Sequence, residues 1–202
     1  MKTKGFTLVE ILLVIFLIGT MATVAISSYI NSTTNFKFLS SYQQVTSALR
    51  VARSNALSNE LQSGVSTKRY GVCISSTNVI TFADTGDKEF KFDLKDSNKA
   101  VGCNDTDIFA TSITNEDVKL QDKTFDLGVQ GYVVDVIGME LPVLIFYDNG
   151  TGNLKAINGK NETIDKAVNP YLNISVAQKV GTLTRYIKVY QVSGLAEEST
   201  TK

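Results

Sequence analysis

The sequence predicts an α+β fold, in which a long N-terminal transmembrane α-helix packs on a globular head made mostly of antiparallel β-sheet. Two observations predict it. Between residue 6 and Ile26, Glu10 is the only charged residue, and such a run of roughly 20 residues is long enough to cross a bilayer as a helix. After Gly64, short segments rich in β-branched and aromatic residues alternate with turn residues, as strands of an antiparallel sheet do. The sequence therefore predicts one helix followed by one β-rich domain.

The first part of that helix, residues 6–27, is predicted to be the membrane span. Lys2 and Lys4 precede it, and the next basic residue is Lys37. Basic residues favour the cytoplasmic side of a membrane, so we expect the N-terminus in the cytoplasm and the head outside.

The second part, residues 28–63, is predicted to be the outer, amphipathic half of the helix. Apolar residues recur in steps of three and four between Leu39 and Leu61, which places them along one stripe. We expect the stripe to fill the core of the head; a coiled-coil partner is the alternative, although the repeat lasts barely three heptads. Gly64 marks the end of the helix. Residues 27–38 are rich in Ser, Thr and Asn, so a kink or frayed turn is expected there.

The β-rich head is predicted to occupy residues 64–195, with a polar and disordered tail at 196–202. Gly and Asn tolerate the positive φ of tight hairpins, so the stretch Asn149-Gly-Thr-Gly is expected to be a turn. The strands are expected at residues 69–75, 78–83, 89–94, 117–120, 131–137, 141–147, 154–157, 172–177 and 182–192.

The composition excludes several classes of enzyme. The chain has 202 residues, 20 basic and 20 acidic, and no histidine. Without an imidazole there is no Ser-His-Asp triad, no Cys-His pair and no zinc site of the usual kinds. The neutral balance also lacks the basic surplus of proteins that bind nucleic acid through phosphates. We expect a protein that is not an enzyme and has no catalytic residue, cofactor or metal.

Cys73 and Cys103 are the only cysteines, and both lie in the part expected outside the cytoplasm. An even pair in an oxidising compartment is most simply a disulfide. Closing a loop of about 30 residues would stabilise the fold by roughly 3–4 kcal/mol in the chain-entropy treatment. Two buried free thiols are the alternative.

Residues 5–10 read Gly-Phe-Thr-Leu-Val-Glu. This segment resembles the class III signal of type IV pilins and pseudopilins. The resemblance implies that a prepilin peptidase removes the leader, residues 1–5, by cutting between Gly5 and Phe6. Phe6 would become the N-methylated terminus, and Glu10 would pair with the terminal amine of a neighbouring subunit during assembly. An ordinary secretory signal is cut after its apolar region; neither it nor a plain signal anchor accounts for a Gly-Phe pair followed by an acid.

Two further segments indicate which branch of the pilin and pseudopilin superfamily the chain resembles. Residues 48–57, Ala-Leu-Arg-Val-Ala-Arg-Ser-Asn-Ala-Leu, are similar to the ARS-x-A stretch of the GspH/FimT minor subunits. Residues 144–153 resemble the F-x-x-x-G strand-turn segment of those heads. The resemblance implies a subunit, minor in number, of a type IV pilus or a type II secretion pseudopilus. Its alternatives are a major pilin, or a tip subunit of a competence or adhesion pilus that binds DNA or a surface.

The resemblance also implies partners and a location. The partners would be other pilin or pseudopilin subunits, the prepilin peptidase, the inner-membrane assembly platform and the membrane itself. The chain would be a single-pass inner-membrane protein that is incorporated into a cell-surface or periplasmic filament. Candidate DNA contacts are the cationic residues Arg50, Arg53, Lys179, Arg185 and Lys188, for which a solvated polar face is the alternative.

Overall fold

The structure is a computed structural model of the 202-residue chain. It divides into two compact units, Met1–Ser40 and Ser41–Lys202, and each is described by itself. The leader and Phe6, Gly64 and the strand expected at 89–94 lie outside the described residues. The described residues are 7–58, 61–62, 65–66, 69–84, 103, 117–160, 162–163 and 170–200.

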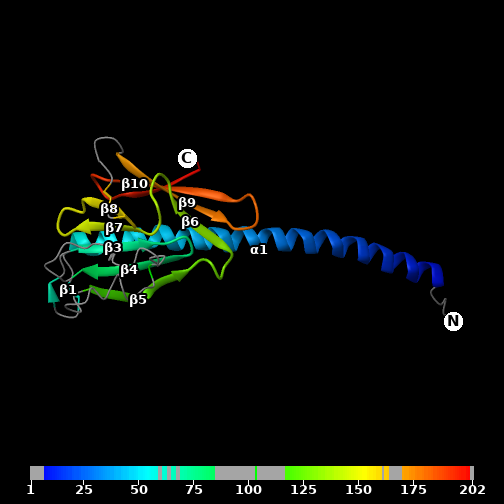
Figure 1. The fold of residues 1–202 in the computed structure, drawn as a ribbon. Helices are drawn as coiled ribbons and strands as arrows, with labels where there is room; N and C mark the ends of the chain where they lie inside the picture. The colour runs from blue at the N-terminus through cyan, green and yellow to red at the C-terminus, as the bar shows by residue number, and fades with distance from the viewer. Residues whose placement is uncertain are drawn as a thin grey trace. The chain divides into compact units, whose positions relative to one another are not determined.

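One long helix, α1, runs from Leu8 to Ser58 (Figure 1). The frayed turn expected within residues 27–38 is wrong, because this stretch is helical throughout, whereas the kink stays a prediction. The hydroxyls of Ser27, Thr33 and Thr34 donate to the carbonyl oxygens four residues earlier in the helix. These side chains therefore bond to the helix's own backbone, a pattern that is compatible with a helix but favours a slight bend. Leu61–Gln62, which was predicted to be helical, forms the short strand β1.

The strands β3 to β10 lie close to their predicted positions, and every strand pair is antiparallel. The fold is thus α+β, with an apolar N-terminal helix and antiparallel sheets, as expected. The strands are β1 Leu61–Gln62, β2 Val65–Ser66, β3 Arg69–Ile74, β4 Asn78–Asp84, β5 Asp117–Asp126, β6 Tyr132–Val136, β7 Val143–Asp148, β8 Leu154–Asn158, β9 Tyr171–Gln178, β10 Thr184–Tyr190 and β11 Ala196–Ser199.

The strands form a four-stranded sheet in the order β11-β10-β9-β6, a five-stranded sheet in the order β5-β4-β3-β7-β8, and the short pair β1-β2. A backbone hydrogen bond joins the two larger sheets, because the Val134 amide of β6 donates to the Ser76 carbonyl in the β3–β4 turn at 2.9 Å. Within the five-stranded sheet, the Leu127 amide, just after β5, donates to the Thr77 carbonyl of the same turn at 2.8 Å. The turn between β3 and β4 thereby pairs with the outer edge of β6, which leaves that edge less open to other strands.

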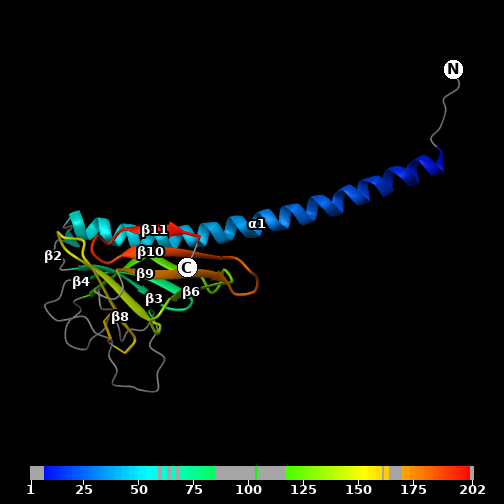
Figure 2. The ribbon, with the colours of Figure 1, turned by 90° about the horizontal axis from the view of Figure 1, so that it is seen from above.

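Most of the predicted apolar stripe of α1 is core, as expected. In Figure 2 the strands lie on one side of the part of α1 that belongs to the second unit. The Tyr42 hydroxyl donates to the Tyr186 carbonyl on β10 at 2.9 Å. The stripe residues Tyr42, Val45, Leu49, Ala52 and Ala56 are buried, whereas Leu57 is 40% exposed.

The disordered tail predicted for residues 196–202 is wrong in its first part. Ala196–Ser199 forms β11, which pairs with β10 in register Tyr186↔Ser199 to Val189↔Ala196. Ala196 is buried, whereas Glu197 and Glu198 are exposed. The backbone ladder orders this segment while its charged side chains stay in water, as is usual for an edge strand. The polar composition of residues 196–199 therefore did not indicate a strand.

Candidate functional site

The N-terminal end of α1 holds Glu10 in a local hydrogen-bonded cap. The backbone N and Oγ1 of Thr7 donate to Glu10 Oε2 at 2.8 and 2.9 Å. In return, the Glu10 amide donates to Thr7 Oγ1 at 3.3 Å. This reciprocal pair is a capping box, and it places the carboxylate at the positive end of the helix dipole. Glu10 was predicted as a functional residue but Thr7 was not, although the T-x-x-E spacing is the sequence signal for this capping partner.

The turns that follow Glu10 are apolar on every side. Between Leu8 and Ile18 each large apolar side chain is exposed, from 48% for Leu17 to 75% for Leu8. A helix that is apolar all round is stable only inside a membrane or inside a protein assembly. By length and composition α1 is able to cross a membrane, and none of its apolar window is buried within the chain.

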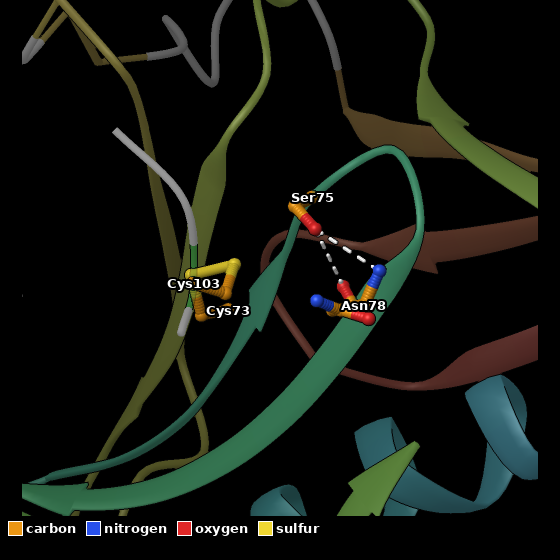
Figure 3. The surroundings of a disulfide bond; sticks show 4 residues. All are labelled: Cys73, Ser75, Asn78 and Cys103. Carbon is orange, nitrogen blue, oxygen red and sulfur yellow. Dashed lines mark hydrogen bonds between the residues drawn. A yellow bond between two sulfur atoms is a disulfide. The ribbon is translucent and has the colours of Figure 1, made fainter. Parts of the chain in front are cut away.

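Cys73 and Cys103 form a disulfide, with their Cα atoms 5.7 Å apart (Figure 3). The free-thiol alternative is therefore wrong. Cys73 lies on β3 opposite Ile80 of β4 and Leu144 of β7, so these three side chains share one face of the five-stranded sheet. The bond attaches Cys103 to a buried apolar cluster on that face. The cluster consists of Cys73, Ile80, Phe82, Cys103, Leu144, Phe146 and Ile157.

The two arginines of α1 that were candidate DNA contacts bind the protein's own backbone. Arg50 Nε and Nη2 lie 3.4 and 3.3 Å from the Ala196 carbonyl oxygen. Arg53 Nε donates to the Ser193 carbonyl at 2.7 Å. Both residues therefore attach α1 to the turn and strand that follow β10.

The three cations on and beside β10 do not extend this pair into one patch. Arg185 and Lys188 are three residues apart on one strand, so they point to opposite faces of the sheet. The Arg185 guanidinium lies 5.7 Å from the centroid of the Tyr42 ring, and Lys188 Nζ lies 5.2 Å from that of Tyr171. Lys179 is exposed in the turn between β9 and β10. A continuous cationic track for a nucleic-acid backbone is therefore not formed by these five residues.

The two segments that resemble minor subunits meet at the C-terminal end of α1. The Gly150 amide donates to the Ala56 carbonyl at 2.9 Å, which satisfies one of the helix's terminal acceptors. A β-carbon built on Gly152 would lie 3.0 Å from Leu57 Cδ2. The turn between β7 and β8 thus caps the helix, a long-range contact that periodicity could not reveal.

The described residues also contain an open hollow beside β11, with a volume of about 290 Å³. It contains one cation, Arg50, and one carboxylate, Glu198. Within the described ranges no group of three or more His, Cys, Asp or Glu side chains is placed to hold a metal ion. The hollow is lined by Gln43, Thr46, Ser47, Arg50 and Glu198.

Comparison with known proteins yields no match to a family model, to a curated protein or to a solved structure. The residues of the chain itself therefore carry the functional argument.

Proposed function

We propose that this chain is a minor subunit of a type IV pilus or a type II secretion pseudopilus. A prepilin peptidase would cut between Gly5 and Phe6, and the chain would then assemble through α1. The observation that carries the proposal is the lone carboxylate of Glu10, which sits in the first turn of a helix that is apolar all round. Glu10 also caps the helix through Thr7, so a test of the proposal has to separate the charge of Glu10 from its capping role.

The unpaired charge of Glu10 favours a role in assembly over simple anchoring. An ionisable side chain within the hydrocarbon of a bilayer is unfavourable unless it finds a partner. In the single chain, Thr7 offers the Glu10 carboxylate two hydrogen bonds but no positive charge. The methylated amine of Phe6 from a neighbouring subunit would supply that charge. A buried pair recovers much of the desolvation penalty, and only one axial register brings the two groups together.

The charge distribution and the disulfide support the proposed orientation. Lys2 and Lys4 would stay in the cytoplasm until cleavage, and the head would lie outside. Disulfides persist in oxidising compartments, so the Cys73–Cys103 bond agrees with an exported head. The partners would be the peptidase, the inner-membrane assembly platform and other subunits of the filament.

The contact between Gly150 and Ala56 supports the minor-subunit assignment over a major pilin. It joins the two segments, residues 48–57 and 144–153, that each resemble GspH/FimT heads in sequence. Segments that resemble one family and also pack together are better support than either segment alone.

Two substitutions of Glu10 test the proposal. Glu10→Leu removes the charge and the cap, whereas Glu10→Gln keeps a side chain that can complete a capping box. We expect normal leader removal from both variants, measured by the mass of the chain, and loss of both from the polymer fraction when they are co-expressed with the filament's other subunits. Incorporation of Glu10→Gln at the wild-type level would show that the charge is not needed. Incorporation of both variants would contradict the proposal.

A further inference from the structure

One face of the four-stranded sheet carries a cluster of tyrosines. Strands β9 and β10 lie side by side (Figure 2), and their register sets Tyr171 opposite Tyr190 and Tyr186 opposite Ser175. Residues that lie opposite each other point to the same face of a sheet, and so do residues two or four positions apart on one strand. Tyr171, Tyr186 and Tyr190 therefore share one face, which we name the tyrosine face, and all three are half-buried.

The helix α1 packs on the opposite face of this sheet. Between the tyrosines, the alternate residues of β9 and β10 include Ile174 and Ile187, which are fully buried. Arg185 belongs to that buried face, and its guanidinium lies 5.7 Å from the centroid of the Tyr42 ring of α1. The tyrosine face is therefore not the surface that binds α1, and its side chains stay partly exposed.

Two of the tyrosines are held by their neighbours. The rings of Tyr171 and Tyr190 meet edge to face, with their centroids 6.1 Å apart and their planes at 66°. Lys188 Nζ lies 5.2 Å from the centroid of the Tyr171 ring, so it covers one side of that ring. A hydrogen bond with Glu197 raises the pKa of Tyr190. Tyr171 and Glu197 thus position Tyr190, and the rings left open to a ligand are those of Tyr186 and Tyr190.

The charges of the tyrosine face do not suit an anionic polymer. Asp135 of β6 lies opposite Ser175, and Glu197 of β11 lies opposite Lys188, so both carboxylates belong to this face. Both are exposed. On the described strands the face thus carries one cation against two carboxylates. A phosphate polymer needs a surplus of basic residues, which is lacking here.

The apolar content of the tyrosine face does not suit a protein partner. The buried centre of a protein interface is apolar. No large aliphatic side chain on the four strands of this sheet is exposed, because those of this unit that the structure describes as exposed lie in α1 and in turns. The face instead offers aromatic rings beside hydroxyl, amide and carboxylate groups, which come from Ser175, Asn173, Asp135 and Glu197.

We propose that the tyrosine face binds a neutral, extended oligosaccharide whose sugar rings are joined by β-1,4 linkages. The C–H groups of a sugar ring carry a partial positive charge, which the negative face of an aromatic ring attracts. Hydroxyls of the same sugars would donate to the carboxylates of Asp135 and Glu197. Tyr186 and Tyr190 are four residues apart on β10, a distance of about 13 Å, so a ligand that contacts both rings contains several sugars.

The shape of the tyrosine face favours this linkage. A β-1,4-linked chain of glucose or N-acetylglucosamine is a flat ribbon, with its hydroxyls at the edges and its C–H groups above and below. An α-1,4-linked chain of glucose coils instead. Tyr186 and Tyr190 lie in line along one strand, so a ribbon is able to contact both rings at once. This inference goes beyond the proposed function and does not depend on it, because neither the leader nor Glu10 takes part.

Calorimetric titration of the full-length chain, in a detergent without a sugar headgroup, tests the proposal. The probes are cellohexaose and chitohexaose, and maltohexaose is the matched α-linked control. We expect saturable binding of at least one of the β-linked probes, and binding of maltohexaose that is at least about tenfold weaker.

Four substitutions locate the binding site. Tyr186→Ala should lower the affinity at least about fivefold, whereas Tyr186→Phe should retain it, because the phenyl ring still stacks. Asp135→Asn removes a charged acceptor at an exposed position where packing is not disturbed, and should lower the affinity about threefold or more. Val192→Ala is the matched control, because Val192 is exposed in the turn after β10, and it should bind as the wild type does.

The outcomes decide this inference separately from the proposed function. Binding of neither β-linked probe would overturn it, as would equal affinity for maltohexaose or an equal loss of affinity in Val192→Ala and Tyr186→Ala. Binding of an oligothymidylate in place of the sugars, with a steep salt dependence, would make the face a platform for single-stranded nucleic acid. Each of these results would leave leader removal and the dependence on Glu10 untouched.

Discussion

Gly194 lies directly against Gly152, so that a β-carbon on Gly194 would come within 2.5 Å of the Gly152 carbonyl oxygen. Both glycines have φ of +66°, a conformation that other residues adopt only with strain. The contact joins the β10–β11 turn to the β7–β8 turn, and the Tyr147 ring lies beneath it, 2.9 Å from the same β-carbon position. Two turns far apart in the sequence therefore form one end of the head.

Gly194→Ala should destabilise the fold far more than a glycine replacement that meets only backbone strain. Gly138 is the matched control, because its φ is +84° and a β-carbon there would meet nothing within 4 Å. We expect a loss of about 1 kcal/mol for Gly138→Ala and of about 3 kcal/mol or more for Gly194→Ala. Urea unfolding of the full chain in detergent, followed by circular dichroism, measures both. Equal losses would show that the two turns are not packed this closely.

Tyr147→Phe should be neutral or stabilising near pH 7. Tyr147 is buried, and its hydroxyl has no hydrogen-bond partner among the described residues, so the wild-type chain carries an unmade hydrogen bond there. Tyr42→Phe is the matched control, because the Tyr42 hydroxyl donates to Tyr186. We expect Tyr42→Phe to cost about 1 kcal/mol. A loss of that size for Tyr147→Phe as well would indicate a partner for its hydroxyl.

The same tyrosine gives a pH dependence with a definite sign. Burial raises the pKa of Tyr147, and only a smaller effect of Arg53 opposes the increase. A tyrosine in the unfolded chain ionises near pH 10. Ionisation of Tyr147 therefore leaves the free energy of unfolding unchanged below about pH 10 and lowers it as pH rises further, because only the unfolded chain releases the proton. Between pH 8 and 11, the free energy of unfolding should decrease less with rising pH for Tyr147→Phe than for the wild type.

Arg53→Gln should lower stability and leave DNA binding unchanged. The Arg53–Ser193 hydrogen bond involves a charged donor, so its loss should cost about 1–2 kcal/mol. Lys179→Gln, at an exposed turn position, should change stability by less than about 0.5 kcal/mol. A gel-shift assay over a series of salt concentrations checks the second claim, since phosphate contacts produce a steep salt dependence. Weaker DNA binding by a fully stable Arg53→Gln chain would favour the DNA-binding alternative.

Removing the disulfide should weaken one sheet more than the other. Cys73→Ala with Cys103→Ala should lower the free energy of unfolding by roughly 3–4 kcal/mol. The buried cluster around the bond belongs to the five-stranded sheet, so amide exchange should accelerate in β3, β4 and β7 before it does in β9 and β10. Reductant should reproduce this effect in the wild type and have none on the double variant. Uniform acceleration in both sheets would contradict a local role.

Most of the fold could be predicted because its segments have strong local patterns. The strands around Cys73 and Leu144 are short apolar runs bounded by turn residues, and the stripe through Leu49 has helical periodicity. The end of α1 could not be predicted, because the apolar stripe continues to Leu61 while the cap comes from Gly150, far along the chain. Tertiary contacts of this kind override local preference.

The candidate site was predictable only in part, and for the same reason. Glu10 stands out in the sequence as a lone charge in an apolar run. Arg50 and Arg53 also stand out as charges, but their acceptors are backbone carbonyl oxygens of residues about 140 positions away. The side chains of residues 193–196 give no indication of such a contact, and for the same reason β11 was not predicted.

The mass of the N-terminal peptide of the chain, isolated from membranes of cells that make the filament, tests the central claim most directly. We expect a peptide that begins at Phe6 and carries one added methyl group on its amine. A chain that assembles or functions while it still holds Met1 through Gly5 would contradict it.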